Sequence, residues 1–260
     1  EQRYKPLGSA ALAALPPLTW RVRGVLPAQG LAAIYGPSGS GKSFLGIDLC
    51  CAIARGRSWF GKHVTAAPVV YLALEGEGGI RLRVLAWEKH NGEPLPDGLR
   101  FILESFDMSS RQDLADLLAV LPAEGVVVID TLNRAAPSVD ENSSKDMGQV
   151  LTAAKTIQAH TAGLVVLIHH TGKDQTKGLR GHSSLHAALD GAIEVQRVAG
   201  WRSWSVAKAK DGEDGGSYTF DLKTVAVGED EYGFTESSCV IVPAVVDAVV
   251  EPKLTGGQAL

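Results

Sequence analysis

The chain has 260 residues, of which 45% are hydrophobic and 21% are charged, and this composition excludes a disordered, collagen-like or coiled-coil protein. Its length suits one large domain with a buried core of its own. The net charge of −4 argues against a protein that coats nucleic acid through bulk charge. Residues 1–62 nevertheless carry eight Lys and Arg against two acids, so a local basic surface is still allowed.

Cysteine usage and hydropathy indicate the compartment. Cys50 and Cys51 are adjacent and the third cysteine is Cys239, so a disulfide framework is not expected. The longest apolar runs, such as Leu164–Ile168, are much shorter than the roughly 18 residues that a membrane helix needs. We therefore expect a cytoplasmic protein in a reducing environment, without contact with a membrane.

Apolar runs of strand length alternate with segments of helical period over most of the chain. Residues 1–23, which include an Ala-, Leu- and Pro-rich stretch, are expected to form an arm or linker. The expected elements that follow are a strand at Leu31–Tyr35, a helix at Ser43–Ala54, a strand at Val69–Leu74, a helix at Ile80–His90, a strand at Phe101–Leu103, a helix at Asp113–Leu121, a strand at Val126–Ile129, a helix at Lys145–His160 with a cap at Ser143 or Ser144, and a strand at Leu164–Ile168. Continuous apolar strands between helices are typical of a parallel sheet that is covered on both faces, so we predict an α/β fold.

The pattern changes after residue 191, where strands follow one another without helices. These strands are expected at Ala192–Val198, Ser203–Lys208, Tyr218–Val225 and Val240–Val245. The acidic DGEDGG segment at 211–216 indicates a hairpin turn. The sequence thus predicts a mainly parallel sheet extended by antiparallel strands, in one domain over 24–248 with a tail over 249–260.

The segment after the first strand matches the phosphate-binding pattern G-x-x-x-x-G-K-[ST] in full. In such a loop the glycines let backbone N–H groups turn inward around a phosphate, and the helix that follows adds its positive end. We therefore predict a site for ATP and Mg²⁺, in which Lys42 reaches the β- and γ-phosphates and Ser43 binds the metal. The predicted nucleotide-binding residues are Gly36, Pro37, Ser38, Gly39, Ser40, Gly41, Lys42, Ser43 and Phe44.

Two other apolar strands end in an acid. Asp130 ends the run VVVID, and a carboxylate at the carboxyl end of a parallel strand is well placed to hold Mg²⁺ through its water shell. Glu75 ends the run VVYLALE and is the candidate general base, with Glu77 as its nearby competitor.

These motifs together resemble the RecA-like P-loop ATPases, and more closely the RepA-like hexameric replicative helicases of plasmids and phages. The resemblance covers about residues 24–225 and is carried by the P-loop, YLALEGEGG, VVVIDTLNR, VVLIHHTGK and GLRGHSSLHAALDGAIEVQR. It implies a RecA-like core in which Glu75 is the catalytic base and His170 senses the γ-phosphate. His169 points to the opposite face of its strand, so a hydrogen-bonded structural role is expected for it rather than a shared metal site.

The resemblance also implies that a basic loop after His170 faces DNA in the channel of a ring. Here this loop is Thr171–His182, and Lys173, Lys177 and Arg180 are its candidate DNA-binding residues. Its alternative is a solvated polar loop.

A cation from the neighbouring subunit completes the active site in such rings. Arg180 matches the family's arginine-finger candidate, and Lys208 and Lys210 match a second pattern in which relatives often end in Lys-x-Arg. Lys in place of that arginine leaves open which group acts in trans. The alternative for Lys208 and Lys210 is an exposed strand edge, where lysines discourage pairing.

The implied function is an ATP-hydrolysing hexameric ring that moves single-stranded DNA, with replication proteins as further partners. A regulatory or recombination-mediator ATPase that acts on protein partners is the main alternative, and the negative net charge favours it. A nucleotide-dependent scaffold is a third hypothesis, against which the intact set Lys42, Ser43, Glu75 and Asp130 argues. A small-molecule kinase would need a lid segment that the sequence does not show.

Overall fold

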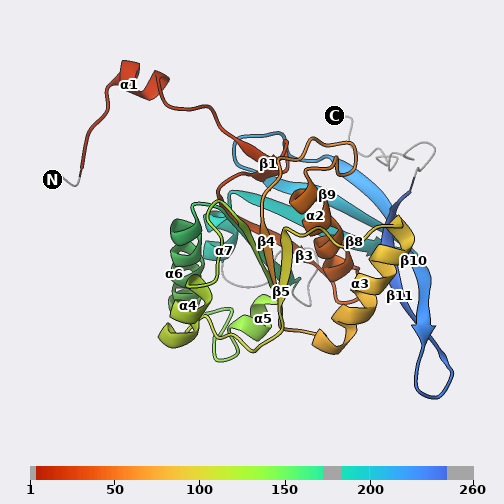
Figure 1. Cartoon of the computed structure of the whole chain (residues 1–260). Coiled ribbons are helices and arrows are strands. Elements are labelled where there is room, and N and C mark those ends of the chain that lie inside the picture. The colour runs from red at the N-terminus through yellow and green to blue at the C-terminus, as the bar shows by residue number, and fades with distance from the viewer. Residues whose placement is uncertain (1–3, 172–182, 199, 245–260) are drawn as a thin grey trace, which may run out of the picture.

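The fold is built on a nine-stranded sheet (Figure 1). The computed structural model describes residues 4–171, 183–198 and 200–244. The strand order is β11-β10-β9-β8-β3-β7-β6-β4-β5. The parallel strands are β3 (Gly30–Gly36), β4 (Val69–Ala73), β5 (Leu99–Ile102), β6 (Val126–Asp130), β7 (Leu164–His170) and β8 (Gly191–Val198), and the strands β9 (Trp201–Ala209), β10 (Ser217–Glu229) and β11 (Thr235–Pro243) extend the sheet in antiparallel fashion. The predicted α/β fold with a mainly parallel sheet and antiparallel C-terminal strands is confirmed.

Helices cover both faces of this sheet and enclose two hydrophobic clusters. Helices α2 (Lys42–Arg55) and α3 (Glu77–Asn91) pack on one face, while α4 (Arg111–Leu118) and α6 (Ser144–Thr161) pack on the other (Figure 1). Successive residues of β4 point to opposite faces of the sheet, so Tyr71 belongs to the first cluster and Leu72 to the second. This double burial is why the strands read as continuous apolar runs.

The N-terminal residues form an arm that extends away from the body of the protein (Figure 1). Its short helix α1 (Ser9–Ala13) buries no residue. The arm ends earlier than residue 23, because the strand β1 (Trp20–Val22) already pairs with β2 (Leu26–Pro27) and Val22 is fully buried. Strand pairing therefore begins at Trp20, three residues before the expected end of the arm, and the domain bounds stay a prediction.

Other differences from the sequence prediction concern short or polar elements. Helices α5 (Leu132–Ala135) and α7 (Ser183–Ala188) were not expected, since segments this short carry no recognisable periodicity. Strand β11 begins at Thr235 and ends at Pro243, because its polar first half, TESS, pairs with the end of β10. The α6 cap is Ser143, whose side chain accepts a hydrogen bond from the backbone N–H of Asp146. Within the described ranges, no helix is long and apolar enough to cross a membrane.

Removing the side chain of Trp204 should destabilise the fold strongly. Trp204 is fully buried on β9 and stacks between Trp59 and Tyr218, with ring centroids 4.6 and 4.2 Å away. We expect Trp204→Ala to lower the free energy of unfolding by about 3–5 kcal/mol, measured by urea denaturation. Trp201, on the same strand but 59% exposed, provides the matched control, and Trp201→Ala should change the free energy by less than about 0.5 kcal/mol.

Candidate nucleotide site

The register of the parallel strands brings the predicted site residues to one edge of the sheet. Gly36 at the end of β3 lies opposite His170 at the end of β7, and Asp130 at the end of β6 lies opposite Ala73 at the end of β4. Glu75 follows two residues after Ala73. The carboxyl ends of these strands therefore present a phosphate-binding loop and three titratable side chains together, where open α/β sheets bind ligands.

The P-loop joins β3 to α2 and depends on its glycines. A Cβ added to Gly36 would lie 2.0 Å from the carbonyl oxygen of Val195 on β8, so only glycine fits there. Gly39 and Gly41 adopt left-handed backbone angles, with φ of +72° and +101°. Gly41 is the N-cap of α2 and offers no side-chain cap, which leaves the first N–H groups of the helix available to an anion. The hydroxyl of Ser40 is buried without a hydrogen-bond partner in the described structure, as expected of a group that faces a ligand.

The ammonium group of Lys42 lies inside the loop. Its Nζ donates to the carbonyl oxygens of Gly36 and Pro37, at 2.9 and 2.8 Å, and lies 3.3 Å from Nδ1 of His170. Burial lowers the pKa of Lys42 to about 8, against the opposing effect of the nearby carboxylates of Asp130 and Glu75. A bound phosphate would supply the negative charge that favours the protonated form.

Asp130 is held next to Ser43 and Tyr71. The hydroxyl of Tyr71 donates to Oδ2 of Asp130 at 2.6 Å, while Oδ1 is buried and accepts no hydrogen bond from the described residues. Burial raises the pKa of Asp130, and the hydrogen bonds from Tyr71 and Ser43 oppose that shift. A hydroxyl and an unsatisfied carboxylate oxygen are the ligands that Mg²⁺ prefers, so these residues fit the predicted metal.

Glu75 and His170 face each other beside the P-loop. Oε2 of Glu75 accepts a hydrogen bond from the hydroxyl of Thr131 at 2.9 Å and lies 3.8 Å from Nε2 of His170. Burial and the charge of Lys42 lower the pKa of His170, which keeps the imidazole neutral near pH 7. With Nδ1 accepting from Lys42, the ring proton is on Nε2 and faces the Glu75 carboxylate. Lys42, His170, Glu75 and Thr131 thus form a continuous polar chain.

His169 points to the other face of β7, as its position next to His170 predicts. It is fully buried, and its Nε2 lies 3.9 Å from Oε2 of Glu141. The two histidines therefore do not converge. The described part of the chain has no group of three or more His, Cys, Asp or Glu that could hold a metal ion.

Comparison with known proteins identifies the family of this chain. A family model described as an AAA domain matches residues 2–176, about two thirds of the chain. The chain belongs to this AAA domain family. It is a P-loop ATPase domain, and proteins of this kind bind ATP with Mg²⁺.

Solved structures similar to this AAA domain confirm the RecA-like fold. The RadB recombinase is 16% identical with a TM-score of 0.56, over 75% of this chain and 89% of that one. The flagellar accessory protein FlaH from Methanocaldococcus jannaschii is 13% identical with a TM-score of 0.50, over 85% and 91%. At these identities the likeness concerns the fold alone.

Five predicted site residues of the AAA domain are not among those gathered at the carboxyl edge of the sheet. Lys173, Lys177 and Arg180 fall outside the described residues. Nζ of Lys208 donates to the carbonyl oxygen of His186 at 2.8 Å, and Nζ of Lys210 lies 3.2 Å from Oδ1 of Asp190. Lys208 lies opposite Ala192 near the amino end of β8, and the backbone N–H of Lys210 donates to the carbonyl oxygen of Asp190 just before that strand. Among the described residues, the two ammonium groups contact these neighbours and not the P-loop, and a role in trans stays a prediction.

The structure adds three residues to the site that sequence reasoning missed. Tyr71 positions Asp130 and Thr131 positions Glu75. A lone hydroxyl in the buried run VVYLA signals the first, because a buried tyrosine needs a hydrogen-bond partner. The third is Arg202 of β9, whose Cδ lies 3.6 Å from the place of a Cβ on Gly41 and whose Nε is buried without a hydrogen-bond partner among the described residues. No local sequence pattern indicates Arg202, because it is the pairing of β9 with β8 and β10 that places it beside the P-loop.

The pKa of Lys42 predicts how nucleotide affinity depends on pH. The ammonium form binds phosphate, and with a pKa of about 8 in the free protein it is lost as the pH rises through that value. We expect the affinity for an ATP analogue with Mg²⁺ to fall about tenfold between pH 7 and pH 9, measured by calorimetric titration. In Lys42→Arg the affinity should be lower but independent of pH in this range, because guanidinium stays protonated. A flat profile in the unmodified protein would contradict the assignment.

Proposed function

We propose that this protein is an ATP-hydrolysing, ring-forming motor that acts on single-stranded DNA, as a replicative DNA helicase. The observation that supports it is the polar chain from Lys42 through His170 to Glu75. His170 touches the P-loop lysine on one side and the candidate base on the other, and Thr171–His182 follows it directly in the sequence. A change at the phosphate is thereby linked to the segment that carries Lys173, Lys177 and Arg180.

In the proposed reaction each residue has a distinct task. Lys42 and the N–H groups at the start of α2 hold the phosphates and stabilise the charge that develops on the transferred phosphoryl group. Ser43 and Asp130 would hold Mg²⁺, and the bound ion would supply positive charge to the phosphate oxygens. Glu75 orients the attacking water, and the hydrogen bond from Thr131 fixes that carboxylate. His170 senses whether the γ-phosphate is present.

The proposed ring places ATP between subunits, so that a neighbour supplies a cation. Lys208 and Lys210 are candidates because their own contacts are with His186 and Asp190 and not with their own P-loop, and Arg180 is the third candidate. A RecA-like ATPase that acts on protein partners without unwinding DNA remains the second candidate function, and the net charge of −4 favours it.

Replacing Glu75 by Gln should separate binding from hydrolysis. The amide keeps the shape and can still accept from Thr131, but it cannot act as a base. We expect ATP affinity to change little and the turnover number to fall about 100- to 10 000-fold, measured by phosphate release and analogue binding. Glu77→Gln is the matched control and should retain turnover. Normal turnover in Glu75→Gln would contradict the role of Glu75.

A DNA motor should hydrolyse ATP faster when single-stranded DNA is bound. We expect single-stranded DNA to increase phosphate release, and the protein with a non-hydrolysable ATP analogue to have the mass of a hexamer. In Lys177→Ala/Arg180→Ala the stimulation should be lost, whereas Lys145→Ala/Lys155→Ala, which removes two exposed cations of α6, should retain it. Turnover that is indifferent to DNA would overturn the helicase proposal in favour of the protein-partner ATPase.

A further inference from the structure

The hairpin formed by β10 and β11 extends past the carboxyl edge of the sheet (Figure 1). Near the P-loop, Leu222 of β10 lies 3.5 Å from the place of a Cβ on Gly41. Strand β10 continues for seven residues beyond Leu222, which corresponds to roughly 24 Å of extended chain. The hairpin therefore reaches well beyond the candidate nucleotide site.

The tip of this hairpin is ordered, yet its aromatic side chains are exposed. Oδ1 of Asp230 accepts hydrogen bonds from the backbone N–H groups of Tyr232 and Phe234, at 2.9 and 2.8 Å, and N–H of Asp230 donates to the carbonyl oxygen of Phe234 at 2.8 Å. Tyr232 and Phe234 are nevertheless 76% and 71% exposed. Rigid, exposed aromatics lose little conformational entropy on binding and are common anchors of interfaces.

The tip is also strongly acidic. Glu229, Asp230 and Glu231 precede the two aromatics directly. A surface that receives this tip should therefore combine apolar contacts with positive charge.

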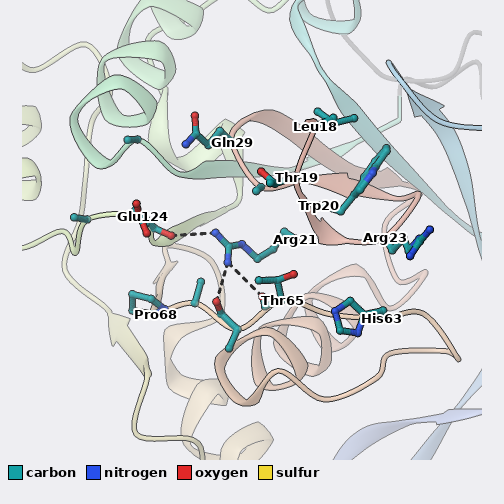
Figure 2. A pocket seen from close by; sticks show the side chains of 15 residues that line it. Leu18, Thr19, Trp20, Arg21, Arg23, Gln29, His63, Thr65, Pro68 and Glu124 are labelled. Carbon is teal, nitrogen blue, oxygen red and sulfur yellow. Dashed lines mark hydrogen bonds between the residues drawn. The ribbon is translucent and has the colours of Figure 1, made fainter. Parts of the chain in front are cut away.

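Such a surface lies at the opposite end of the molecule. A cavity of about 700 Å³ opens at the amino ends of the parallel strands, lined by Gln29, Pro68 and Glu124, which immediately precede or lie near the starts of β3, β4 and β6 (Figure 2). Its apolar wall includes Leu18 and Trp20, and its polar wall includes Arg21, Arg23 and His63.

The hydrogen bonds of the Arg21 guanidinium in this cavity all go to backbone carbonyl oxygens. Its guanidinium donates to the carbonyl oxygens of Thr65, Ala66 and Glu124, at 3.3, 2.9 and 3.1 Å (Figure 2). Arg21 is only 6% exposed, and its Nε has no hydrogen-bond partner among the described residues. Arg23 beside it is exposed. The two arginines outnumber Glu124 in the lining, so the cavity suits an acidic ligand.

We propose that the tip at Glu229–Thr235 of one copy docks into the Arg21–Arg23–Trp20 cavity of a second copy. The contact is head to tail, because the tip and the cavity lie at opposite ends of the sheet, and head-to-tail contacts generate rings when the rotation closes. Tyr232 and Phe234 pack against Leu18 and Trp20, while the acidic residues of the tip face the two arginines.

The same contact bears on the trans cations. Gly212, two residues after Lys210, is close enough to Trp20 that an added Cβ would lie 3.0 Å from the indole ring. A tip seated against Trp20 would therefore also lie beside the turn that follows Lys208 and Lys210. This inference rests on the ring assembly proposed above but does not depend on DNA.

Cross-linking between two batches of full-length protein tests the contact directly. In a Cys239→Ser background, one batch carries Tyr232→Cys and the other, of different size through a tag, carries His63→Cys. We expect a disulfide-linked heterodimer only in the mixture and only with an ATP analogue. A batch with Lys155→Cys, on the exposed face of α6, replaces His63→Cys as the control and should form at least tenfold less heterodimer. Equal yields with the two partners would overturn the proposal.

Solution assembly gives a second, independent readout. Tyr232→Ser/Phe234→Ser should weaken self-association about 30-fold by analytical ultracentrifugation, with an unchanged melting temperature. Glu231→Lys and Arg23→Glu should each weaken it, and the two changes together should restore it. An unchanged association constant in the aromatic variant overturns the contact. A hexameric mass and DNA-stimulated hydrolysis that persist in that variant would leave the proposed motor standing without this contact.

Discussion

The in-register pairing of four parallel strands is the constraint on which the site depends. Pairing of Gly36 with His170, and of Ala73 with Asp130, fixes the ends of β3, β7, β6 and β4 at one edge. The candidate side chains for phosphate, metal and water are therefore positioned by backbone hydrogen bonds between central strands that are almost entirely buried. A shift of one residue in any of these strands would turn its polar end group to the opposite face.

Strand β8 and the antiparallel strands β9 and β10 also support this edge. Strand β8 approaches the P-loop so closely that the carbonyl of Val195 fills the place of a side chain at Gly36. Phe220, Leu222 and Arg202 then cover Gly41 from β9 and β10. The P-loop is thus supported on one side by the parallel core and on the other by strands that come much later in the chain.

The sequence was sufficient for the fold class and for the residues that a local pattern marks. The apolar runs predicted the central strands, and the Gly-rich motif predicted the turn between β3 and α2, because both are dictated by neighbours in the chain. Arg202 and the aromatic hairpin tip were not predicted, since their positions depend on pairing between distant strands. Strand β1 was not predicted, because it is only three residues long and Val22 pairs with residues outside it, in β2 and at Val64. The fit of Lys208 and Lys210 to a neighbouring subunit stays a prediction, because their described partners all belong to the same chain.

Helix α3 connects the surroundings of Glu75 with the long hairpin of β10 and β11. It begins two residues after Glu75, and its outer side packs against β10 and β11, where Arg81 pairs with Glu236 at 3.2 Å. Glu236 lies opposite Gly228, close to the end of the hairpin. A single helix thus joins the loop that carries Glu75 to the far part of the hairpin. A displacement of the hairpin would therefore be transmitted through α3 to that loop.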